Sequence, residues 1–171
     1  MSIIAVRIYP TFYEMAADSI TVRGWTKTVN NGRNTKLFEE NGVVVGSSGL
    51  ARDSGLLRLF LRTRRPAAAD EASIVDFFSE FADWMKKRTE VYGTDNDFII
   101  GFEGRVFHFR DFFVDEIVSY EAIGAGMDYA LGALQNGASA SEAVEAAIAL
   151  SCFCAPPVQK IEKIWGGRPL E

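Results

Sequence analysis

The chain alternates between blocks of short strand-like runs and pairs of helical patterns, and no other feature restricts its fold as much. Runs of β-branched and aromatic residues predict strands, and apolar residues at helical spacing predict helices. In chain order we expect strands at residues 3–7, 12–17, 20–23, 35–38 and 43–47, helices at 50–62 and 70–88, strands at 97–102, 105–110 and 112–118, helices at about 126–136 and 139–148, and a strand at 158–165. This order predicts an α+β fold, a four-layer αββα sandwich of two antiparallel sheets flanked by helices.

Several boundaries carry recognisable capping or turn residues. Asp70 is an expected helix N-cap, and Ser139 with Glu142 has the spacing of a capping box. Glu103 and Gly104 have the chemistry of a hairpin turn. The segment from Trp25 to Asn34 contains Asn and Gly without any period, so we predict a loop there.

The helix predicted at residues 70–88 has the most regular apolar stripe in the chain. Its members are Ile74, Phe77, Phe78, Phe81, Trp84 and Met85. These are more large apolar side chains than one covered face of a small subunit readily hides. We therefore expect a homo-oligomer in which the helices at residues 50–62 and 70–88 form much of the subunit contact.

Length and charge exclude several classes of protein. At 171 residues the chain is expected to form a single domain, residues 1–171. Its net charge of -5 argues against general binding of nucleic acid, for which a basic face is usual. No run reaches roughly 18 apolar residues and no signal peptide opens the chain, so we expect no membrane association and a cytoplasmic location.

The residues that could bind a metal or cofactor are few. Cys152 and Cys154 are too few and too close for a disulfide framework, and are expected to be reduced, mostly buried thiols. His108 is the only histidine, so these three residues cannot complete a zinc site. It lies on a predicted polar strand face, where we expect it to be solvent-facing or hydrogen-bonded. Gly124 and Gly126 lack the third glycine and the Lys-Ser/Thr of a phosphate loop, so neither metal nor cofactor is predicted.

The residue behind the initiator Met is a small hydroxyl residue, Ser2. If Met1 is removed, Ser2 carries a free α-amine beside its own hydroxyl. A nucleophile and a general base would then share one residue, as in N-terminal nucleophile hydrolases. The alternative is an ordinary first strand in which Ser2 has no chemical role.

Five short motifs are spread over most of the chain. They are Ser2-Ile-Ile-Ala-Val-Arg7, Ala16-Ala17-Asp18-Ser19, Thr35-Lys36-Leu37-Phe38, Gly46-Ser47-Ser48-Gly49 and Ile123-Gly-Ala-Gly-Met-Asp-Tyr-Ala130. In this order they resemble the motifs of the proteasome-type family of N-terminal nucleophile hydrolases, especially its bacterial HslV-like branch. The match is weak in identity.

The resemblance implies a role for each of four residues. The Ser2 hydroxyl would attack a peptide carbonyl while its α-amine takes the proton. Lys36 would lower the pKa of that amine as a neighbouring cation, and Asp18 would anchor Lys36. The backbone N–H of Gly49 would stabilise the oxyanion. Taken singly, Lys36 with Asp18 could be an ordinary ion pair and Gly49 an ordinary helix-entry turn.

The chain also departs from the family pattern. Counted back from Arg7, the nucleophile falls on Met1; counted back from Asp18, it falls on Ser2. A one-residue slip would turn the side chains to the opposite face. Supporting polar positions are altered as well, since Ala125 replaces a serine and the family's Asp-x-x-Ser-Gly group becomes Ser151-Cys-Phe-Cys154-Ala155. Losing these groups removes hydrogen bonds that orient the amine.

Three functions follow as hypotheses. The first is a peptidase subunit of a self-compartmentalising homo-oligomeric ring that takes polypeptide substrates, with a possible ATP-dependent unfoldase as partner. The second is a catalytically inactive protein of the same fold that serves as an assembly or interaction module. The third is an amide hydrolase that uses the same nucleophile on a small molecule. The mass of the intact protein tests the first and third, because both require loss of Met1.

Overall fold

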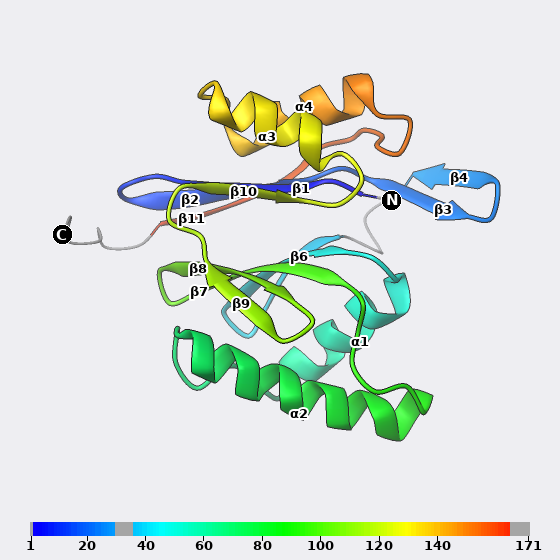
Figure 1. The fold of residues 1–171 in the computed structure, drawn as a ribbon, viewed down its shortest axis with the longest axis vertical. Helices are drawn as coiled ribbons and strands as arrows, with labels where there is room; N and C mark the ends of the chain where they lie inside the picture. The colour runs from blue at the N-terminus through cyan, green and yellow to red at the C-terminus, as the bar shows by residue number, and fades with distance from the viewer. Residues whose placement is uncertain (1, 30–35, 165–171) are drawn as a thin grey trace.

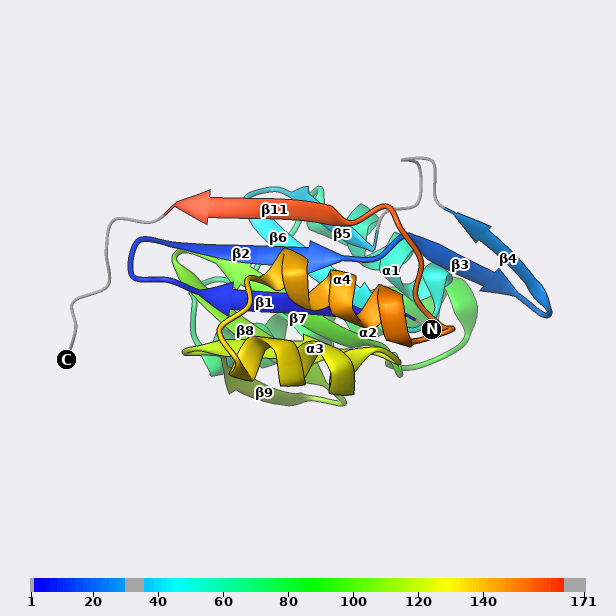
Figure 2. The same cartoon turned by 90° about the horizontal axis from the view of Figure 1, so that it is seen from above.

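Two antiparallel sheets form the centre of the computed structural model, which describes residues 2–29 and 36–164. The first sheet has the strand order β10-β1-β2-β11, comprising Tyr120–Ile123, Ile4–Ile8, Phe12–Ala17 and Gln159–Ile164. The second has the order β5-β6-β7-β8-β9, comprising Leu37–Glu40, Val43–Ser48, Asp97–Phe102, Arg105–Arg110 and Phe113–Glu116. A separate hairpin, β3 (Ile20–Arg23) with β4 (Thr26–Val29), extends beyond the end of the first sheet (Figures 1 and 2).

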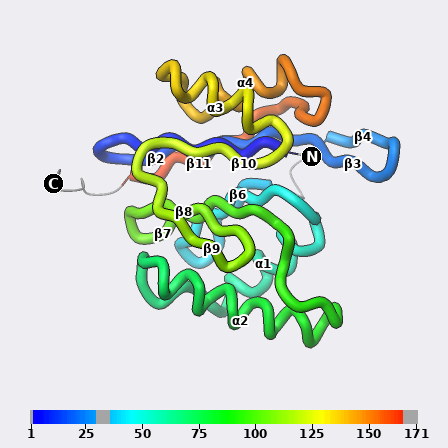
Figure 3. The backbone as a smooth tube through the Cα atoms, viewed as in Figure 1, coloured from blue at the N-terminus to red at the C-terminus, as the bar shows by residue number. Residues whose placement is uncertain are grey.

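Helices cover the outer face of each sheet. Helices α3 (Met127–Gln135) and α4 (Ala140–Leu150) lie over the first sheet, and α1 (Ala51–Leu61) and α2 (Glu71–Thr89) lie over the second (Figure 1). Strands β5 to β9 of the second sheet follow one another along the chain, and the segment after β9 leads back to the first sheet at β10 (Figure 3). The expected antiparallel sheets and four helices are therefore present.

Three apolar cores separate these elements. The first core lies between the first sheet and helices α3 and α4, and it includes Ile3 and Ala5. A second lies between the sheets and includes Ile4 and Val6, so the first strand alternates between two buried faces. The sheets approach so closely that a Cβ on Gly46 would overlap Ile4. The third core lies between the second sheet and helices α1 and α2.

Helix α2 has the stripe predicted from its sequence, and the chain's own second sheet covers most of it. Asp70 caps the helix by accepting a hydrogen bond from Ser73 N at 2.8 Å. Phe78 stacks on Phe109 of the sheet at a ring distance of 3.6 Å. The other stripe residues are also buried within the chain itself, except Trp84, which is partly buried. The stripe therefore supplies no argument for a subunit contact at these helices.

Four smaller expectations were wrong. Residues 26–29 form β4 rather than a loop, because a Thr-Lys-Thr-Val run pairs with β3; residues 30–34 lie outside the described residues. Residues 120–123 form β10, an edge strand hidden in the sequence by the glycines that follow it. Leu50 is 54% exposed at the start of α1 instead of sharing its buried face. On β8, Val106 lies in the core between the sheets, so the face shared with His108 is only partly polar.

Two other expectations concern the state of the cysteines and the presence of membrane-spanning helices. Both cysteines are free thiols, with Cys154 buried as expected but Cys152 exposed. Within residues 2–29 and 36–164, no helix is long and apolar enough to cross a membrane.

Candidate functional site

The carboxylate of Asp18 lies at the centre of the candidate site. Asp18 follows the last residue of β2 and is fully buried. Its Oδ1 accepts hydrogen bonds from Ile3 N at 3.0 Å and from Lys36 Nζ at 2.6 Å. Its Oδ2 accepts from Ile20 N at 3.0 Å and from Ala155 N at 3.1 Å. Burial of a charge is costly unless it is paired and hydrogen-bonded, and here both oxygens have two donors.

Lys36 reaches Asp18 from the other sheet. It precedes β5, and its carbonyl accepts a hydrogen bond from Ser47 N on β6 at 2.8 Å. Its side chain is 12% exposed. Burial lowers the pKa of Lys36 below its ordinary value, while the charge and hydrogen bond of Asp18 oppose that effect. The result is a buried cation that stays paired but loses its proton more readily than a surface lysine.

Ser2 is buried directly beside this ion pair, since it precedes Ile3, whose N–H binds Asp18 Oδ1. Its carbonyl accepts a hydrogen bond from Gly126 N at 3.2 Å. A Cβ on Gly124 would lie 2.5 Å from that carbonyl oxygen and 2.9 Å from Ser48 Oγ, so this turn lies against both serines. Ser2, Asp18 and Lys36 are thus brought together from three separate segments.

The register of the first two strands bears on the choice between Met1 and Ser2. The ladder runs without a break from Ile8 opposite Tyr13 to Ile4 opposite Ala17, and Asp18 N then donates to Ile3 O at 3.2 Å. Ile3 lies in the core under α3 and α4, and Ile4 lies between the sheets. The same alternation, extended by one residue, directs position 2 toward the space between the sheets, from which Lys36 approaches. Met1 lies outside the described residues.

Gly49 lies one residue beyond Ser48, at the turn from β6 into α1. Its φ of 137° is one that residues with a Cβ rarely adopt, and a Cβ there would overlap Asn96 Oδ1. Glycine is therefore required at this position by backbone conformation and by packing. This explains the residue without reference to catalysis.

The altered motif segment Ser151 to Ala155 also lies at the site. Ala155 supplies one of the four donors to Asp18, and Ser151 Oγ accepts a hydrogen bond from Phe153 N at 3.2 Å. Cys154 has a raised pKa, chiefly because it is buried and also because Asp18 is near; a hydrogen bond with Ser151 and the charge of Lys36 act in the opposite direction. The Cys154 thiol is consequently held in its neutral form beside the ion pair.

Sequence reasoning missed two residues of this region. Ala155 acts through its backbone N–H, for which side-chain identity gives no signal. Asn96, which holds the turn at Gly49, lies in a polar segment predicted only to connect α2 to β7. Among the described residues, no group of His, Cys, Asp and Glu has the arrangement of a metal site.

The arrangement provides the parts of an acyl-transfer site, namely a hydroxyl residue near the chain start, a paired lysine and a glycine turn. Known structures share its architecture. BPH of Thiobacillus denitrificans in complex with epoxomicin superposes with a TM-score of 0.86 at 20% identity, over 95% of this chain and 98% of that one. The chain therefore shares the fold of this BPH structure.

Two further solved structures agree with this fold. Anbu (ancestral beta-subunit) from Yersinia bercovieri has a TM-score of 0.70 at 16% identity, over 94% of this chain and 80% of that one. The Anbu (Gly-1) mutant from Hyphomicrobium sp. strain MC1 has a TM-score of 0.69 at 14% identity, over 96% and 87% of the two chains. No family model and no curated protein sequence matches the chain.

Proposed function

We propose that the chain is a proteasome-like peptidase subunit of the N-terminal nucleophile type, with Ser2 as nucleophile after removal of Met1. One observation carries the proposal. Asp18 Oδ1 binds both Ile3 N and Lys36 Nζ, so a buried lysine is held beside the backbone of the residue that follows Ser2.

The proposed acylation step uses the hydroxyl and α-amine of Ser2, the Gly49 N–H and the Lys36 cation. The Ser2 hydroxyl oxygen forms a bond to the substrate carbonyl carbon as its proton passes to the Ser2 α-amine. The carbonyl electron pair moves onto oxygen, where the Gly49 N–H donates a hydrogen bond. When the C–N bond breaks, the ammonium returns the proton to the leaving amine, and water later hydrolyses the ester. Lys36, as a cation fixed by Asp18, keeps the pKa of the α-amine low enough for it to act as a base.

The finer features of the proposal follow from resemblance to the HslV-like branch. We assign the fold to the four-layer αββα sandwich of a single domain, residues 1–171. The subunit would assemble into a cytoplasmic homo-oligomeric ring, cleave polypeptides inside it and receive them from an ATP-dependent unfoldase. The shared fold with BPH and Anbu supports this choice over an unrelated hydrolase.

The mass of the intact protein and a covalent probe test the proposal together. Epoxomicin is bound in the BPH structure and is a suitable probe. We expect loss of Met1, a single epoxomicin adduct mapped to Ser2, and cleavage of a fluorogenic peptide. Ser2→Ala and Lys36→Ala should each lower turnover by about three orders of magnitude or more without changing the mass of the assembly. Processed protein that cleaves no peptide of a broad library and forms no adduct would refute it.

A second candidate is the inactive module of the same fold. It is favoured by Ala125, Ser151 and Cys154 at positions where the family places polar support for the amine. Under this reading Ser2→Ala and Lys36→Ala change no rate, because the wild-type protein has none.

A further inference from the structure

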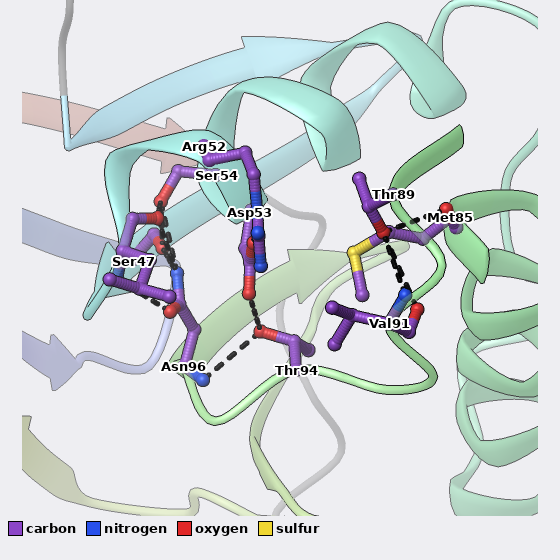
Figure 4. A network of polar contacts seen from close by, with 10 residues as sticks. Ser47, Arg52, Asp53, Ser54, Met85, Thr89, Val91, Thr94 and Asn96 are labelled. Atoms are coloured by element: carbon purple, nitrogen blue, oxygen red, sulfur yellow. Dashed lines mark hydrogen bonds and ion pairs between the residues drawn. The ribbon is translucent and has the colours of Figure 1, made fainter.

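The buried side chain of Asn96 holds the turn that contains Gly49 from two sides. Its Oδ1 accepts a hydrogen bond from Leu50 N at 2.7 Å, and its Nδ2 donates to Leu50 O at 3.0 Å. The same Nδ2 lies 3.3 Å from Ser47 Oγ and 3.2 Å from Ser54 Oγ, and these two hydroxyls are 2.6 Å apart. One amide thus links Leu50 to Ser47 and to Ser54 in the first turn of α1. Figure 4 shows Asn96 beside the two serines.

Asn96 is itself fixed by a second set of contacts. Its backbone N donates to Thr94 Oγ1 at 3.1 Å, and Thr94 Oγ1 donates to Asp53 Oδ2 at 2.8 Å (Figure 4). Asp53 is 1% exposed and its other oxygen accepts from Arg52 Nε at 2.7 Å. A fully buried amide anchored at both ends has little freedom to rotate, so it can transmit a defined geometry to the turn.

The contacts bracket the peptide that carries the Gly49 N–H. Ser48 is held on one side by its place opposite Asp97 in the β6–β7 ladder. Leu50 is held on the other side by both polar atoms of the Asn96 side chain. Asn96 Oδ1 also occupies the space that a Cβ on Gly49 would take. With both flanks fixed, the direction of the Gly49 N–H is set by Asn96 and the ladder together.

We propose that Asn96 is a positioning residue that aims the Gly49 N–H at the oxyanion formed when Ser2 attacks. The inference rests on the proposed function of Ser2 and Gly49 and adds a residue to it. A donor fixed before the reaction starts stabilises developing charge without the cost of reorganisation. A purely structural role at the start of α1 would instead affect stability and leave the rate unchanged.

Two variants and one control separate these roles in the processed, full-length protein. Asn96→Ala removes every side-chain contact. Asn96→Asp keeps the size of the side chain and the acceptor for Leu50 N, but it places an oxygen against Leu50 O. This variant serves as the test if Asn96→Ala does not fold. The matched control is Asp70→Ala, which removes a side-chain acceptor from the start of α2, a helix remote from Gly49.

We expect both Asn96 variants to lower kcat at least about tenfold while KM changes less than about threefold. Affinity for a peptide boronate, which forms a tetrahedral adduct on the nucleophile, should fall in parallel with kcat. Hydrogen exchange at the Gly49 and Leu50 amides should become faster in the Asn96 variants and not in the control. A kcat and boronate affinity equal to those of Asp70→Ala would overturn the inference.

Failure of the proposed function would be visible separately. If the wild-type protein cleaves no peptide and binds no boronate, that function fails and takes the catalytic part of the inference with it. The exchange rates at Gly49 and Leu50 then decide alone whether Asn96 holds the turn. Unchanged exchange in both variants would refute that part as well.

Discussion

Asp18→Asn tests whether the buried ion pair is the anchor of this site. The substitution removes the charge and turns one carboxylate oxygen into a donor. If that donor replaces Oδ2, it faces the N–H groups of Ile20 and Ala155; if it replaces Oδ1, it faces Ile3 N and Lys36 Nζ. In either orientation two donors lose their acceptor, and Lys36 loses its counter-ion.

The expected loss of stability is large. Removing one partner of a buried pair costs about 3–5 kcal/mol, because the other charge stays buried without compensation. That cost already includes the donors left unsatisfied, which contribute about 1–3 kcal/mol each. Lys36 can escape part of this by releasing its proton, since burial already lowers its pKa and Asp18 no longer opposes the effect. We therefore expect a decrease of about 4 kcal/mol in the free energy of unfolding at neutral pH.

The loss should depend on pH in a defined direction. In the variant, folded Lys36 has a pKa even further below that of the unfolded chain. Between those two values the unfolded state binds more protons, so the free energy of unfolding rises as pH rises. Urea unfolding at about pH 7 and about pH 10 should show the deficit shrinking at the higher pH.

The exposed pair Lys163–Glu39 provides the control, because its N–O distance is also 2.6 Å. Its side chains are 38% and 39% exposed, and Glu39→Gln should cost less than about 1 kcal/mol at either pH. A similar small loss in Asp18→Asn, or a loss that does not change with pH, would refute the reasoning.

Three other predictions follow from the structure. If the Lys36 cation is needed for turnover, kcat/KM for a peptide should fall on the alkaline side at a pH below the ordinary lysine range, since burial lowers the pKa of Lys36. A kcat/KM that does not change with pH below the ordinary lysine range would contradict this. Cys154→Ser should retain turnover, because the raised pKa keeps this thiol neutral; loss of turnover in an intact assembly would move the nucleophile to Cys154. Phe78→Ala should lower the free energy of unfolding by about 3–5 kcal/mol, because its ring is buried against Phe109. A variant that assembles more weakly while the subunit keeps its stability would instead indicate that α2 forms a subunit contact.

Most of the elements could be predicted because their signals are local. The apolar stripe of α2 and its Asp70 cap depend on residues three and four apart, and the structure has both. The capping box of Ser139 and Glu142 is formed as well. Strand β3 was predicted, but its partner β4 was missed because Asn and Gly dominate the surrounding window. The edge strand β10 was missed because it pairs with β1, which lies more than a hundred residues earlier in the chain.

The site was predictable only as a set of residue types. The order of the motifs indicated Ser2, Asp18, Lys36 and Gly49, and the structure brings the first three together around one carboxylate. The catalytic roles of all four stay predictions. Asn96 carried no pattern in the sequence, because its significance lies in contacts to Leu50, Ser47 and Ser54, all more than 40 residues away.

The sequence by itself determined the succession of strands and helices, since periodicity and capping act between neighbouring residues. Only the tertiary structure decided how the first strand is registered against Asp18, because strand pairing and sheet packing act between distant segments. The same packing decided what the aromatic stripe of α2 covers. Sequence shows that a helix has an apolar face, but the surface that buries it, here the chain's own second sheet, exists only once the chain has folded.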